Sequence, residues 1–120
     1  MSDDLPPLDA ETLGILQGIS TATVTTLLLK KGLRSLWMRG PKPLGHAATG
    51  RRIAGRAFTL RFVPAREDLA TPESWASPRS TRGAIEAMPE GCIAVAGTGG
   101  CLDAGIFGDI LALRMAKRGV

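Results

Sequence analysis

A glycine-rich stretch, Gly97 to Gly108, lies near the C-terminal end of the chain and is followed directly by Asp109. The short apolar run 92–96 before it predicts a buried strand, and residues 109–118 after it have the pattern of a helix. Glycines let a backbone approach a ligand closely, and the first N–H groups of a helix have no acceptor within that helix. Strand, loop and helix together therefore predict a site for a small anion, either a carboxylate or a phosphate.

Asp109 is the side chain at this site that suits acid–base chemistry. An aspartate at the start of a helix is commonly its N-cap residue, and that structural role stays open. Such a carboxylate can also lie beside a ligand and act as a general acid or base. Either role predicts Asp109 at the edge of the anion site.

Two familiar phosphate-binding motifs do not fit this stretch. A P-loop requires Lys followed by Ser or Thr after its second glycine, but Ile106 and Phe107 follow Gly105. A dinucleotide motif that starts at Gly97 requires glycine where Leu102 stands. Mononucleotide and NAD binding are therefore not expected.

Two helices are expected in the first part of the chain. Asp9 is a suitable N-cap for a helix that runs through residue 17, and Ser20 or Thr21 can open a second one. Gly32 is a suitable residue to end the second helix. The second helix is expected to bury an apolar stripe, which consists of Val24, Leu27, Leu28 and Leu29.

The later elements follow from alternation and from chain-breaking residues. Phe58, Leu60 and Phe62 alternate with polar residues, which predicts a half-buried strand over 53–63. Proline and glycine predict a loop over 39–50, and residues 65–79 predict a polar excursion over the surface. Ser80 is expected to cap a helix over 81–88.

Composition limits the class of protein. The 120 residues fit one domain, preceded by a flexible arm at 1–8, and the net charge of +4 suits an anionic partner. No basic block appears, so nucleic acid is not an expected partner. The chain lacks a signal peptide and a long apolar run, which predicts a cytoplasmic protein without a membrane partner.

The C-terminal residues resemble the RraA-like family, which includes regulators of ribonuclease E activity and class II 4-hydroxy-4-methyl-2-oxoglutarate aldolases. The best match is the segment Gly108 to Ala112, followed by Ala116 to Val120. Segments 19–22 and 55–60 also resemble the family, and the resemblance extends over most of 12–120.

The resemblance implies an α/β fold, namely a β/β/α swivelling-type domain assembled as a trimer or a hexamer. It implies retro-aldol cleavage of 4-hydroxy-4-methyl-2-oxoglutarate and decarboxylation of oxaloacetate, with a divalent metal cation, Mg²⁺ or Mn²⁺. By position, the carboxylate of a small 2-oxo acid substrate would lie on Gly108, Asp109, Ile110 and Leu111. Asp109 would be the catalytic residue that handles a proton through water. The alternative activity is regulation of ribonuclease E by protein binding.

The sequence departs from the family at two places. Ala96 stands at a strand end where relatives often have aspartate. The aldolases also carry an Arg-Asp pair that binds substrate and metal, and its expected position lies beyond Val120. The resemblance therefore implies an incomplete domain over 9–120 that lacks its C-terminal strands, holds no metal ligand of its own and has little activity by itself.

Overall fold

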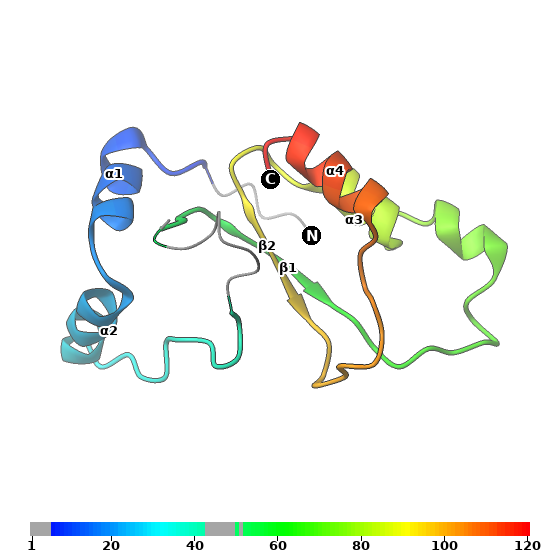
Figure 1. Ribbon diagram of the computed structural model, residues 1–120, viewed down its shortest axis with the longest axis horizontal. Helices are drawn as coiled ribbons and strands as arrows, with labels where there is room; N and C mark the ends of the chain where they lie inside the picture. The colour runs from blue at the N-terminus through cyan, green and yellow to red at the C-terminus, as the bar shows by residue number, and fades with distance from the viewer. Residues whose placement is uncertain (1–5, 43–49, 51) are drawn as a thin grey trace. The chain divides into compact units, whose positions relative to one another are not determined.

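The computed structural model describes residues 6–42, 50 and 52–120 (Figure 1). The chain divides into two compact units, Met1–Ala54 and Gly55–Val120. The first contains the helices α1 (Ala10–Gly18) and α2 (Thr21–Lys30). The second contains, in chain order, β1 (Ala57–Arg61), the 3-10 helix η2 (Pro72–Ala76), α3 (Thr81–Ala87), β2 (Ile93–Gly97) and α4 (Asp109–Lys117).

The caps predicted for the first two helices are confirmed. Asp9 accepts the N–H of Thr12 at 2.7 Å and its hydroxyl at 2.8 Å, and these bonds hold the pKa of Asp9 below its ordinary value. Ser20 accepts the N–H of Thr23 at 3.1 Å. After α2, Gly32 has a φ of 83° and donates to the carbonyl of Leu29 at 2.9 Å, as expected for a helix ended by glycine.

The expectation that α2 buries an apolar stripe is wrong. No residue of this helix is buried, and Leu27 and Leu29 are 51% and 49% exposed. Val24 and Leu28 are only half-buried. The stripe stays open because the described part of residues 6–54 contains two short helices and loops, with no sheet to cover it.

Among the residues that the structure describes, no single helix is long and apolar enough to cross a membrane. Helices α1 and α2 reach that length and composition only when they are taken together, and the chain bends by 108° between them.

The second unit is built on a two-stranded parallel sheet. Residues pair in register from Ala57 with Ile93 to Arg61 with Gly97, so both strands end at the same edge. The alternation predicted for β1 is confirmed, since Phe58 and Leu60 are half-buried while Thr59 is exposed. The predicted strand over 53–63 was too long at both ends, and β2 begins one residue later than predicted.

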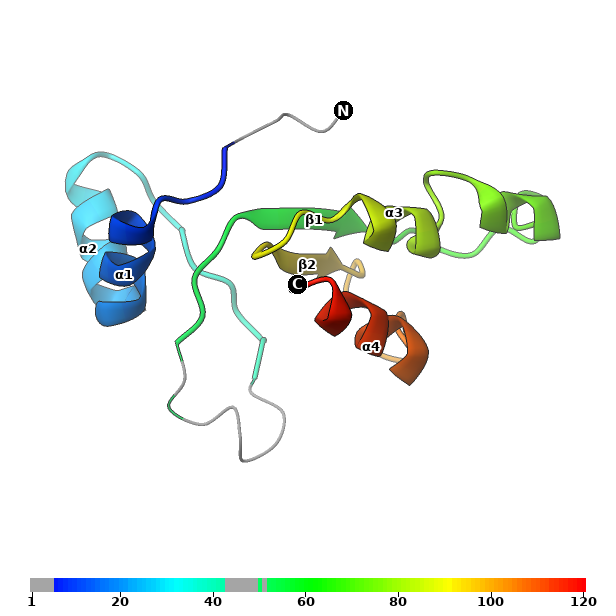
Figure 2. The same cartoon turned by 90° about the horizontal axis from the view of Figure 1, so that it is seen from above.

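The core of this unit lies between the sheet and two helices. Ile85 and Met88 are 1% exposed and Cys92 is 5% exposed. Helices α3 and α4 lie on the same side of the strand pair (Figures 1 and 2). The half-buried residues that pack against the core come from both strands, from α4 and from the residues next to it: Phe58, Leu60, Ala94, Phe107, Leu111, Met115 and Val120. A helical layer on a parallel sheet confirms the α/β class.

The cap predicted for α3 is confirmed, because Ser80 accepts the N–H of Gly83 at 3.1 Å. The excursion over 65–79 contains η2, which the sequence did not predict. Of the predicted loop over 39–50, residues 43–49 lie outside the described residues, as do residues 1–5 of the predicted N-terminal arm.

Candidate functional site

Asp109 is the first residue of α4 and does not cap it. Gly108 is the N-cap, with φ −93° and ψ 176°, and no side chain accepts a bond there. The side chain of Asp109 turns instead to the next residue, and its Oδ1 accepts the N–H of Ile110 at 2.8 Å. The capping role considered for Asp109 is therefore taken by glycine, and the carboxylate is exposed.

The two amides predicted to receive a substrate carboxylate, those of Ile110 and Leu111, differ in whether they already donate a hydrogen bond. Hydrogen bonding along the helix begins with the N–H of Ala112, which donates to Gly108 at 3.0 Å. Within the described residues the N–H of Leu111 has no acceptor, whereas that of Ile110 is engaged by Asp109. The contact with Asp109 lies on the surface, where a hydrogen bond has a net value of about 0.5–1.5 kcal/mol. A ligand carboxylate that displaced it would replace one anionic acceptor by another.

The loop before α4 turns sharply after β2. Gly99 and Gly100 have φ values of 64° and 85°, which side-chain-bearing residues rarely adopt. The N–H of Cys101 closes this turn by donating to Thr98 at 3.2 Å. Leu102 is 92% exposed. The loop thus returns the chain to Gly108 along the surface, and its glycines serve the turn.

A shallow hollow of about 210 Å³ lies beside α4. Leu111 is the member of the predicted site that lines it, together with Trp75, Ser80, Thr81 and Arg82. The guanidinium of Arg82 lies 6.0 Å from the ring centre of Trp75. Sequence reasoning missed Trp75 and Arg82, because both come from a surface excursion and a helix start whose proximity to α4 depends on tertiary packing.

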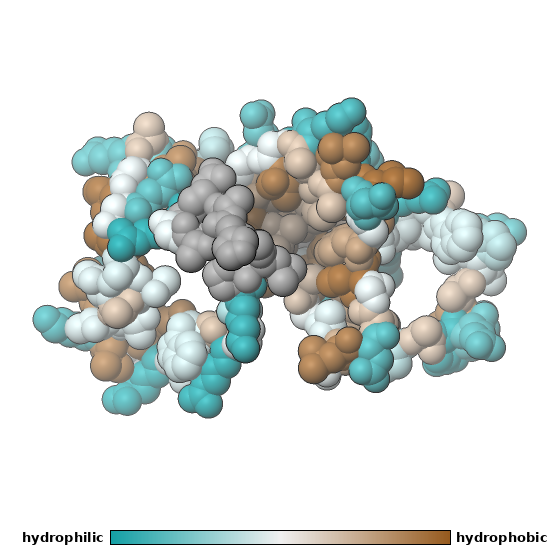
Figure 3. Space-filling view, in the orientation of Figure 1, coloured by the Kyte–Doolittle hydropathy of each residue, from teal (hydrophilic) through white to brown (hydrophobic). Residues whose placement is uncertain are grey.

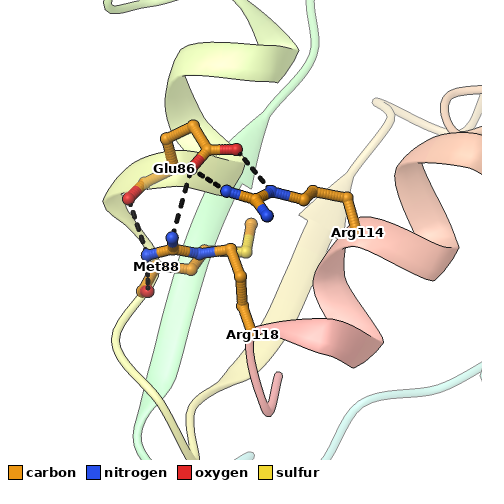
Figure 4. A network of polar contacts seen from close by, with 4 residues as sticks. All are labelled: Glu86, Met88, Arg114 and Arg118. Atoms are coloured by element: carbon orange, nitrogen blue, oxygen red, sulfur yellow. Dashed lines mark hydrogen bonds and ion pairs between the residues drawn. The ribbon is translucent and has the colours of Figure 1, made fainter.

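An ionic network holds α4 against α3 (Figure 4). Glu86 accepts bonds from Arg114 at 2.7 and 2.8 Å and from Arg118 at 3.1 Å. The hydrogen bond from Arg114, together with the charges of both arginines, lowers the pKa of Glu86. Arg118 also donates to the backbone carbonyls of Glu86 and Met88, at 2.8 and 3.1 Å. The network fixes the far end of the helix whose first residue is Asp109.

The described residues do not fit a divalent metal. Across residues 6–42, 50 and 52–120, no group of three or more His, Cys, Asp or Glu side chains is placed to hold one. The site consists of the exposed carboxylate of Asp109 and the unbonded amide of Leu111 at the start of α4.

The fold and this helix start define a small α/β protein. The family model described as "RraA-like: Aldolase/RraA" matches residues 19–120. The chain belongs to the RraA-like family. Neither the curated proteins nor the solved structures contain a match to it.

Proposed function

We propose that this chain carries the substrate-carboxylate and proton-transfer part of a lyase that acts on small 2-oxo acids. The reactions are retro-aldol cleavage of 4-hydroxy-4-methyl-2-oxoglutarate and decarboxylation of oxaloacetate. The observation that supports this most is the exposed Asp109 at the first position of α4, beside the unbonded amide of Leu111.

A carboxylate is favoured at this helix start for two reasons. The N-terminus of a helix carries a partial positive charge, and its free N–H groups donate to an anion. The net charge of +4 also favours approach of a dianionic substrate. Gly108, Ile110 and Leu111 are proposed to surround the substrate carboxylate, while Asp109 turns from Ile110 toward water.

The proposed chemistry breaks one carbon–carbon bond. In the aldol substrate, the C4 hydroxyl loses its proton as the C3–C4 bond breaks, and C4 becomes the ketone carbon of one pyruvate. The electron pair of that bond forms the enolate of a second pyruvate, which is then protonated at C3. Asp109 is proposed to accept the hydroxyl proton through a water molecule and to return it to C3. Oxaloacetate gives the same enolate by loss of CO₂.

The proposed fold is the β/β/α swivelling-type domain of the family, with 1–8 as an arm and 9–120 as part of the domain. The parallel strand pair that packs against α3 and α4 supports an α/β arrangement of this kind. We further propose a trimer or a hexamer in the cytoplasm. Light scattering after gel filtration tests the assembly.

The activity test measures pyruvate formed from either substrate, with Mg²⁺ or Mn²⁺ added. It uses the 120-residue chain and also any longer product whose reading frame continues past Val120 into an Arg-Asp pair. We expect release of pyruvate from the product that carries the pair. Asp109→Asn should lower turnover by about 10²-fold or more. Asp103→Asn, which removes an exposed carboxylate in the middle of the preceding glycine-rich loop, is the matched control and should have no effect. A folded protein with the pair that releases no pyruvate would overturn the proposal.

The alternative, regulation of ribonuclease E by contact, gives a different result. A regulator would retain ribonuclease E in a pull-down and lower its activity, and Asp109→Asn would leave both effects unchanged.

A further inference from the structure

A second and larger hollow lies in the unit Gly55–Val120. Its volume is about 550 Å³, within the range of small-molecule sites. It is largely open and is bordered by the end of β1, the excursion that contains η2, and the start of α3. Figure 3 shows it as the opening at the right of the molecule. It contains none of the residues 108–111, but it shares Trp75, Ser80 and Thr81 with the smaller hollow that Leu111 lines.

The charged side chains around this hollow are all cationic. They are Arg61, Arg66 and Arg79, and no carboxylate lines it. Arg66 is engaged by Asp68 through a two-point ion pair. The guanidinium groups of Arg61 and Arg79 have no acceptor or ion-pair partner among the residues that the structure describes. Two arginines whose guanidinium groups are unbonded therefore border the hollow, and among its lining arginines Asp68 compensates the charge of Arg66 alone.

The rest of the lining is largely apolar. Val63, Leu69 and Trp75 are 71%, 64% and 63% exposed, although each lines the hollow. Phe62, which is half-buried, packs edge-on against Phe107 at 6.0 Å between ring centres. An apolar group placed here would remove these side chains from water, which favours binding. An aromatic ring would additionally stack on Trp75.

We propose that this hollow binds a small organic anion with an apolar, preferably aromatic, body. Its carboxylate receives the planar N–H donors of Arg61 and Arg79, a geometry that guanidinium groups match with two parallel bonds. Its body lies against Trp75, Leu69 and Val63. Inorganic phosphate supplies only the charge, and a neutral aromatic supplies only the body, so each should bind more weakly. The proposal does not depend on the lyase activity.

The test uses isothermal titration calorimetry of the full chain with 2-naphthoate. Two comparison probes separate the contributions: 2-naphthamide keeps the ring without the charge, and inorganic phosphate keeps charge without the ring. We expect saturable 1:1 binding of 2-naphthoate, with each comparison probe at least tenfold weaker. The indole N–H signal of Trp75, assigned by its loss in Trp75→Phe, should shift on addition of 2-naphthoate.

Variants locate the site. Arg61→Gln combined with Arg79→Gln should weaken 2-naphthoate at least tenfold, whereas Arg34→Gln, an exposed arginine in the other unit, should not. Arg61→Lys combined with Arg79→Lys keeps the charge without the planar donors. Its affinity for 2-naphthoate should lie between that of the parent protein and that of the double Gln variant. Circular dichroism confirms that each variant is folded. Equal binding of naphthoate and naphthamide, full binding by the Gln variant, or no binding at millimolar 2-naphthoate would each overturn the proposal.

Discussion

The guanidinium of Arg118 closes the C-terminal end of α3 by donating to the backbone carbonyl of Glu86 at 2.8 Å. The same nitrogen donates to the carbonyl of Met88 at 3.1 Å. The last carbonyls of a helix lack partners within it, and Arg118, the C-cap residue of α4, donates to those at the end of α3. This bond joins two segments far apart in the chain and fixes the helix on which Asp109 stands.

Arg118→Ala should therefore destabilise the protein. Two backbone carbonyls lose a charged donor, for which we expect a loss of about 1–3 kcal/mol in the free energy of unfolding. Urea unfolding followed by circular dichroism measures this. Lys117→Ala removes an exposed cation from the same helix turn and is the control, expected within about 0.5 kcal/mol of the parent. Equal effects of the two substitutions would contradict the role of Arg118.

Acid should weaken the contact between α3 and α4. The pKa of Glu86 is lowered in the folded state, so its contribution is present above the ordinary glutamate pKa of 4.5 and is lost as pH falls through the folded pKa. We expect the free energy of unfolding to fall below about pH 4.5, and Glu86→Gln to flatten part of that fall. Unfolding curves between pH 7 and pH 3 test this. Glu67→Gln, which removes an exposed carboxylate outside the network, should leave the pH profile unchanged.

Two glycines inside helices should respond in opposite ways to alanine. A Cβ atom at Gly83 would lie 2.8 Å from the carbonyl oxygens of Pro78 and Ser77, closer than such contacts occur. Gly83→Ala should cost about 1–3 kcal/mol of stability. At Gly14 in α1 nothing lies within 4 Å, so Gly14→Ala should raise stability by about 0.5–1 kcal/mol. Thermal unfolding measures both, and a loss at Gly14 as large as that at Gly83 would contradict the packing around α3.

The two cysteines should differ in reactivity. Cys92 lies in the core, and its burial raises the pKa of its thiol. Cys101 is exposed in the glycine-rich loop. Under native conditions one thiol should react quickly with a colorimetric disulfide reagent, and the second only on unfolding. Peptide mapping identifies the fast one, which Cys101→Ser should abolish and Cys92→Ser should preserve.

Substitution of Asp109 should change the stability of the protein little, although it should lower turnover strongly. A carboxylate in the first turn of a helix contributes about 0.3–1 kcal/mol, so Asp109→Asn should alter stability by no more than that. Asp109→Ala additionally frees the N–H of Ile110, which should then exchange faster with deuterium than in the parent protein. Hydrogen exchange followed by NMR gives this result without any assay of activity. Unchanged exchange at Ile110 would show that the bond to Asp109 is absent in solution.

Local sequence signals predicted the helices well. Asp9, Ser20 and Ser80 each precede a helix and cap it, because these bonds involve residues only three apart. The alternation of Phe58 and Leu60 with polar residues correctly predicted which face of β1 points inward. These features depend on residues that are close together in the chain, so they can be predicted from the sequence alone.

What the sequence did not reveal depends on packing between distant segments. The helix over 109–118 was predicted, but the pairing of its arginines with Glu86, 28 and 32 residues away, was not. The apolar residues of α2 have the spacing of a buried face, and spacing alone cannot provide a covering surface. At the candidate site, the helix start at Asp109 was found, while the contact of Asp109 with its neighbour Ile110 required coordinates.

The parallel register of the sheet has a consequence for how this protein can vary. Because Arg61 pairs with Gly97, the excursion that follows β1 and the glycine-rich loop that follows β2 leave the sheet at one edge. Of the residues that pack the core, Phe107 lies in this glycine-rich loop and none lies in the excursion over 65–79. Insertions, deletions or exchanges in these segments that keep Phe107 should therefore change the surface at this edge while the scaffold keeps its packing.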